Sequence, residues 1–78
     1  MNKFRKAVEK AQKAHDRASN VIWDICRPDN LRFSEGFKLA TDAQRIDYYQ
    51  TQTVLIEAEQ YAVSNGKAWR SGSMLYWN

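Results

Sequence analysis

Residues 41–66 read TDAQRIDYYQTQTVLIEAEQYAVSNG. Thr41 is followed three residues later by Gln44, which is the spacing of a capping box, where two side chains satisfy free backbone amides at the start of a helix. Asn65 and Gly66 are typical of a helix end, because glycine readily takes the left-handed conformation that closes many helices. This stretch therefore predicts a helix over residues 42–64.

Apolar residues lie on two sides of this predicted helix. One broad arc on a helical wheel comprises Ala43, Tyr48, Val54, Leu55, Ala58, Tyr61 and Ala62. A second arc, roughly opposite, comprises Ile46, Tyr49, Ile56 and Val63. A helix that is apolar on nearly all sides must be covered on nearly all sides. One neighbouring helix covers one side only, so the second arc predicts a further cover, either the C-terminal tail or a second copy of the chain.

A seven-residue apolar repeat runs through the N-terminal segment. Its positions are Phe4, Ala7, Ala11, Ala14, Ala18, Val21 and Ile25, and Val8, His15 and Ile22 lie beside them. The repeat predicts a helix, and the helix should end by about Cys26, because the residue before Pro28 disfavours the helical conformation. Two long helices of matched length predict an antiparallel hairpin.

Residues 27–40 predict a connection that contains a short central element, with Ser34 capping a turn of helix that carries Phe37 and Leu39. A structureless loop of that length is uncommon in a compact domain. The tail that follows Gly66 is rich in aromatic residues. It is one candidate cover for the second arc, as an extended segment or short helix folded back over it, and a second copy of the chain is the other.

The predicted fold class is therefore all-α. Two long antiparallel helices, at about residues 3–26 and 42–64, form a single small domain with a short central element and an aromatic C-terminal tail packed on them. A chain of 78 residues is short for more than one domain. Its 44% hydrophobic and 27% charged residues are typical of a folded protein rather than a disordered one.

The composition also limits the expected location of the protein and the kinds of disulfide and metal site that it can form. No apolar run approaches the ~20 residues that span a bilayer, and charges from Lys3 to Lys13 occupy the place of an apolar signal segment. We therefore expect a cytoplasmic protein without a membrane partner. A single cysteine excludes a disulfide within the chain, and one cysteine with one histidine does not complete a structural zinc site.

The residues that could carry catalysis favour structural roles. His15 is the only histidine and has no nucleophile beside it in the sequence, so we expect it on a helix surface or at an interface. Cys26 ends a helix, where the dipole disfavours a thiolate, and we expect a buried thiol. Glu57 and Glu59 are two residues apart and point away from each other on a helix. The sequence thus predicts a protein that is not an enzyme, with no catalytic residues, no metal site and no cofactor.

Charge is distributed unevenly along the chain. Residues 1–20 carry six basic and two acidic side chains, whereas residues 41–66 carry one arginine and four acids. A basic stripe with helical spacing comprises Lys3, Lys6, Lys10, Lys13 and Arg17. Two interpretations stay open: the stripe contacts nucleic-acid phosphates, or it lies against the acidic helix, within one chain or between protomers.

The tail predicts a surface for a protein partner. Its candidate partner-binding residues are Trp69, Arg70, Tyr76 and Trp77. Tryptophan and arginine are over-represented among the residues that dominate binding energy at interfaces. We expect a non-enzymatic helical protein-binding module that acts as inhibitor or adaptor of a larger partner, of the kind found as accessory proteins of phages or mobile elements. The alternative function is nucleic-acid binding by the basic stripe. We also expect a homodimer whose self-interface is the second arc.

Overall fold

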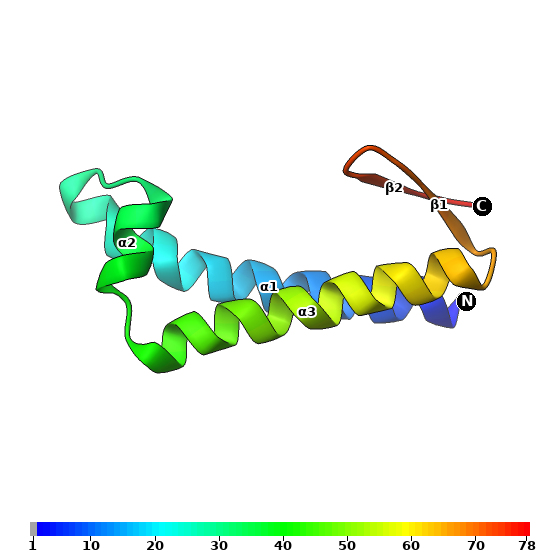
Figure 1. The fold of residues 1–78 in the computed structure, drawn as a ribbon, viewed down its shortest axis with the longest axis horizontal. Helices are drawn as coiled ribbons and strands as arrows, with labels where there is room; N and C mark the ends of the chain where they lie inside the picture. The colour runs from blue at the N-terminus through cyan, green and yellow to red at the C-terminus, as the bar shows by residue number, and fades with distance from the viewer. Residues whose placement is uncertain (1) are drawn as a thin grey trace.

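A computed structural model describes residues 2–78. In chain order the elements are α1 (Lys3–Cys26), a 3₁₀ turn (Arg27–Asp29), α2 (Phe33–Leu39), α3 (Asp42–Ser64), β1 (Ala68–Ser71) and β2 (Met74–Trp77). The helices α1 and α3 lie side by side, α2 closes one end of the pair, and the β1–β2 hairpin lies at the other end (Figure 1). The molecule measures 44 × 23 × 18 Å, so its shape is set by the two long helices.

Local signals determine where α1 begins and ends. The side-chain Oδ1 of Asn2 accepts a hydrogen bond from the amide of Phe4 at 2.9 Å, which satisfies a donor that the helix leaves free. The helix ends at Cys26, and the following turn, which contains Pro28, is 3₁₀. Asn30 then takes a left-handed conformation with a φ of 52° and redirects the chain. The predicted helix over residues 3–26 is confirmed.

Helix α3 also follows its sequence signals. The amide of Gln44 donates to Oγ1 of Thr41 at 3.2 Å, and the amide of Thr41 donates to Oε1 of Gln44 at 2.9 Å, so the capping box is present. After the last helical residue, Gly66 has a φ of 69°, the left-handed conformation expected beyond a helix end. The predicted helix over residues 42–64 is confirmed.

The short central element is helix α2, and its start differs from the prediction. The N-cap is Arg32, whose amide donates to Oε1 of Glu35 at 3.4 Å. The prediction that Ser34 caps this element is wrong, since Ser34 lies within the first turn of α2. The Glu35 carboxylate accepts from the amide of the N-cap residue, as the glutamate of a capping box does, whereas a serine at the cap would accept from an amide inside the first turn.

The contact between α1 and α3 brings the start of one helix beside the end of the other. The rings of Phe4 and Tyr61 lie 5.2 Å apart. Further along, Nδ1 of His15 lies 3.1 Å from Oγ1 of Thr51, and the His15 ring lies 4.8 Å from the ring of Tyr48. His15 is therefore an interface residue, as predicted, and its ring is held between two side chains of α3.

The buried row of α1 agrees in part with the predicted heptad. Ala11 and Ala18 of the heptad are buried, at 6% and 2% exposure. Val8 and Ile22, which lie beside the heptad, are buried at 9% and 0% exposure, whereas Val21 of the heptad remains 39% exposed. The buried row is thus shifted by one residue at alternate positions of the predicted repeat.

The corner between α1 and α2 depends on one glycine. Gly36 is buried, and a Cβ placed on it would lie 2.1 Å from Sγ of Cys26 and 3.3 Å from the carbonyl oxygen of Ile22. Cys26 is itself 2% exposed, and its thiol donates to the carbonyl oxygen of Arg32 at 3.4 Å. The prediction of a buried thiol is confirmed, and the thiol fills the space that Gly36 leaves open.

The C-terminal tail is a β-hairpin, so the fold is not purely all-α. Strands β1 and β2 pair antiparallel with Ser71 opposite Met74, which leaves a two-residue loop. The first loop residue, Gly72, has a φ of 59°, a conformation that such loops require and that glycine adopts without steric cost. The extended form of the tail was one of the two expected, but a helical wheel gives no sign that the two short runs pair with each other.

We predict that Gly36→Ala lowers the free energy of unfolding by about 1–3 kcal/mol, because the added methyl group meets the Cys26 sulfur. The cost should shrink in a Cys26→Ala background, which removes that sulfur. Urea unfolding followed by circular dichroism measures both costs, with exposed Ser34→Ala as the control in the same helix. Equal costs in the two backgrounds would contradict the proposed contact.

Candidate functional site

The pairing of the hairpin sorts its side chains onto two faces. Residues opposite each other in the strands lie on the same face, and successive residues alternate. The pairs Ala68–Trp77 and Arg70–Leu75 therefore share one face. The pairs Trp69–Tyr76 and Ser71–Met74 share the other.

The first face packs on the long helices. Leu75 and Trp77 contact a core cluster formed by Val8, Ala11 and Leu55. Ala68 is 3% exposed, and Arg70 lies 3.6 Å from Oε2 of Glu59 in an ion pair with α3. Arg5 of α1 stands 5.9 Å from the centre of the Trp77 ring. Two of the candidate partner-binding residues, Arg70 and Trp77, thus contact the body of the protein.

The second face is open to solvent and aromatic. Trp69 is 49% exposed, Tyr76 is 42% exposed, and their rings stack with centroids 4.6 Å apart and planes inclined by 20°. Met74 beside them is 58% exposed. We call these three residues the aromatic face. The strand pairing and the ring stacking hold large apolar groups in one geometry before any partner arrives.

Met74 was not among the residues that the sequence singled out. In a helix Met74 would lie about 140° around the axis from Trp69, five residues earlier, and in an irregular segment the two would have no fixed relation. Only the hairpin register places Met74 on the same face as Trp69 and Tyr76. The one available signal was the Gly72–Ser73 pair between two short runs with aromatic residues, which is typical of a hairpin loop.

The basic stripe is exposed along its whole length. Lys3, Lys6, Lys10, Lys13 and Arg17 are all on the solvent side of α1. The ion pairs found among residues 2–78 join Arg5 to Glu9, Arg27 to Asp24, Arg45 to Asp42 and Arg70 to Glu59. None of them involves the stripe. The expectation that the stripe lies against the acidic helix of its own chain is therefore wrong, because α1 turns its Val8–Ile22 side toward α3.

The stripe and the aromatic face belong to different sides of the molecule. The hairpin is fastened to α1 beside Arg5, whose guanidinium lies against Trp77. On an ideal helix, Arg5 is about 120° around the axis from the middle of the basic stripe. A single strand of nucleic acid that follows the stripe would not pass over the aromatic face.

Among residues 2–78, the second arc of α3 is only partly covered. Its residues Ile46, Tyr49, Ile56 and Val63 are 54%, 56%, 43% and 37% exposed, and Phe37 of α2 contacts Tyr49. The possibility that the tail covers this arc is wrong, since the hairpin packs on Leu55 and on α1 instead.

A group of aromatic rings fills the corner between the three helices. Phe33 and Phe37 of α2 lie 5.4 Å and 5.6 Å from the ring of Tyr48. Phe37 also meets Tyr49 at 5.4 Å. A surface cavity of about 450 Å³ borders these rings, and its polar lining comes from the two tyrosines and from Ser34, Lys38 and Gln52. The aromatic contacts tie α2 to the start of α3.

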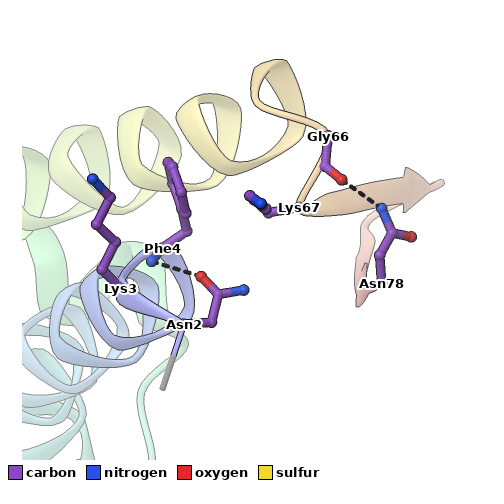
Figure 2. A pocket seen from close by; sticks show the side chains of 6 residues that line it. All are labelled: Asn2, Lys3, Phe4, Gly66, Lys67 and Asn78. Atoms are coloured by element: carbon purple, nitrogen blue, oxygen red, sulfur yellow. Dashed lines mark hydrogen bonds between the residues drawn. The ribbon is translucent and has the colours of Figure 1, made fainter.

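A second cavity lies where the start of α1 meets the end of the hairpin (Figure 2). It has a volume of about 500 Å³ and is lined by Asn2, Lys3, Phe4, Gly66, Lys67 and Asn78. Nδ2 of Asn78 donates to the carbonyl oxygen of Gly66 at 2.8 Å, and Asn2 caps α1. Both amide side chains are thus used within the chain, and the cavity marks where the hairpin is tied to the end of α3.

Residues 2–78 hold no cluster of three histidine, cysteine, aspartate or glutamate side chains that would bind a metal ion. Within the same residues, no helix has both the length and the apolar character needed to cross a membrane. Comparisons with protein-family models, with curated proteins and with solved structures find no match to this chain.

We predict that Trp77→Ala lowers the free energy of unfolding by about 2 kcal/mol, since it removes a ring that packs on the core. Trp69→Ala should cost about 1 kcal/mol or less, because it mainly loses the stacking on Tyr76. Urea unfolding of the two variants measures the difference. A Trp69→Ala cost as large as that of Trp77→Ala would contradict the division of the hairpin into a packed face and an open face.

Proposed function

We propose that this protein is a non-enzymatic binding module that docks on a larger protein partner through the aromatic face, acting as an inhibitor or adaptor. The observation that carries the proposal is the stacked pair of Trp69 and Tyr76, both close to half exposed on a strand-paired surface. Neither ring is needed to seal the core, which Leu75 and Trp77 cover from the opposite face.

Preorganisation is the physical advantage of this surface. Binding normally costs about 0.5–1.5 kcal/mol for each flexible side chain that becomes ordered. Trp69 and Tyr76 are already restrained by each other and by the ladder that joins β1 to β2. Tryptophan and tyrosine also bury large areas on contact and are enriched among the residues that dominate binding energy. A small surface of this composition suits a partner with a complementary apolar pocket.

The face of the hairpin that packs on the long helices supports the aromatic face. Ala68 is nearly inaccessible, Trp77 packs on the helices, and Arg70 pairs with Glu59 of α3. These contacts fix the orientation of the strands relative to the long helices. The roles of the four predicted tail residues thus divide: Trp69 and Tyr76 meet the partner, whereas Arg70 and Trp77 position them.

The side chains available for catalysis support a non-enzymatic role. His15 is engaged with Thr51 and Tyr48 at the helix interface. Cys26 is buried against Gly36. Glu59 is engaged with Arg70. These three groups are therefore already used to hold two elements of the fold together.

We predict that Trp69→Ala combined with Tyr76→Ala weakens capture of the partner by about 30-fold or more, the effect of losing one strong hot spot. The immobilised protein is incubated with an extract of the organism that encodes it, and the captured proteins are identified and titrated against wild type and variant. Leu39→Ala, which removes a 68% exposed apolar side chain far from the hairpin, serves as the matched control. Full capture by the double variant would refute the proposal.

The exposed basic stripe favours nucleic-acid binding as a second candidate function. Its five cations form no ion pair with acidic side chains of residues 2–78 and remain available to phosphates. The stripe extends over about 21 Å of helix, which is long enough to meet several phosphates of a duplex. It ranks second because the overall charge of +3 is modest and α3 is acidic.

For this second candidate we predict that Lys6→Glu combined with Lys13→Glu weakens binding to a labelled mixed-sequence duplex and flattens its salt dependence, because fewer counterions are released. Fluorescence anisotropy at several salt concentrations measures both quantities. Trp69→Ala is the control and should leave binding unchanged, since the hairpin lies on another side of α1. Binding that is unchanged by the two lysine substitutions would rule out the basic stripe as the nucleic-acid-binding surface.

A further inference from the structure

The exposed side of α3 carries a regular heptad pattern. The row that runs through the second arc comprises Ile46, Tyr49, Thr53, Ile56, Gln60 and Val63. We call this row the outer seam. Its spacings alternate between three and four residues over more than two heptads, as in helices that pack along a second helix. The inner side of the same helix, which contains Leu55 and Ala62, is already occupied by α1.

The outer seam is apolar and uncharged although it faces solvent. Its four apolar members are between 37% and 56% exposed. The hydroxyl of Thr53 donates to the carbonyl oxygen of Tyr49 at 3.0 Å, so its polar group is satisfied within the helix and its methyl group is left for packing. The remaining polar end groups of the seam are the side-chain amide of Gln60 and the hydroxyl of Tyr49. An apolar row that stays in water does not stabilise the helix, whereas the same row stabilises a helix that buries it against a second helix.

The chain exposes much surface for its size. It exposes 5790 Å², whereas a folded monomer of its 9.1 kDa mass exposes about 4,900 Å² on average. The outer seam contributes to this excess together with other exposed apolar side chains such as Leu39, Trp69 and Met74. Because α1 covers only one side of α3, a second helix layer on the seam would bury part of this surface.

We infer that the outer seam is the interface at which two copies of this chain pair, α3 against α3, into a four-helix arrangement. A second copy is the occupant that the seam fits, because a helix with a 3.5-residue apolar repeat packs best on a helix with the same repeat, and the chain itself supplies one. No ionised side chain stands on the seam, so two copies meet without burying a charge.

This pairing is independent of the proposed partner-binding surface. The outer seam belongs to α3 alone, whereas the aromatic face lies on the hairpin, which packs over the other side of α3 through Leu55. A dimer formed through the seam leaves both copies of the aromatic face and both basic stripes free. Loss of the dimer and loss of partner capture are therefore separate experimental outcomes.

The test is sedimentation of the purified full chain over a range of concentrations at low and high salt. We expect a mass of twice the 9.1 kDa of one chain, and a thermal midpoint that rises with concentration. High salt should not dissociate the dimer, because its contact is apolar. A wild-type protein that sediments as a monomer at all concentrations, or a dimer that dissociates at high salt, would overturn the proposal.

Substitutions on the seam locate the interface. Ile46→Glu with Ile56→Glu should weaken dimerisation by about 100-fold or more, since each buried unpaired carboxylate costs far more than the contact it replaces. Ile46→Ala with Ile56→Ala should weaken it less while keeping the seam uncharged. The matched control is Val54→Glu, which changes a 55% exposed residue of α3 that lies off the seam.

Each outcome of this series decides the question. Dimers of wild type and of Val54→Glu, together with a helical monomer of the double glutamate variant by circular dichroism, support the proposal. If both double variants dimerise as the wild type does, the proposal is overturned and the interface lies outside the outer seam. A dimer lost on Lys6→Glu with Lys13→Glu, but kept in the seam variants, assigns the contact to the basic stripe of one protomer against the acidic helix of the other.

Discussion

The packing of α1 on α3 through small side chains is the constraint on which the rest of the structure depends. Ala18 and Ala62 are almost inaccessible, and Val8 and Ala11 form a buried cluster with Leu55. Small side chains let the two helices approach closely, yet each buries little apolar area. The helix pair therefore needs further packing contacts at both ends. Helix α2 supplies them at one end through Gly36, and the hairpin supplies them at the other end through Leu75 and Trp77.

That packing also decides which surfaces remain for partners. Once the Val8–Ile22 side of α1 faces α3, the basic stripe must face solvent, and once Leu55 faces α1, the outer seam must face solvent as well. The hairpin sits over both helices and turns Trp69 and Tyr76 outward. A chain with so thin a core thus presents three surfaces of different chemistry in separate places, one cationic, one apolar and helical, and one aromatic. Each can be altered without the others.

Elements with local signals were predictable, and elements without them were not. Thr41 with Gln44, Gly66 and Pro28 each act through bonds or steric contacts within a few residues, so the limits of both long helices follow from the sequence. The start of α2 was predicted wrongly, because its N-cap is Arg32, which is not a typical capping residue, and the bond at this helix start comes from Glu35. Of the candidate site, Trp69 and Tyr76 were found by residue type, but Met74 joins them only through the strand register.

The sequence by itself determined two long helices, the capping box at the start of the second one, and the apolar character of that helix on two sides. These properties depend on the helical period and on capping, which are local. Only the tertiary structure decided that Val8 and Ile22 complete the buried row of α1, that the tail pairs with itself, and that Trp77 points inward while Trp69 points outward. These outcomes depend on how much apolar area each side chain buries against residues that are distant in the chain. The spacing of residues along the sequence does not give that area.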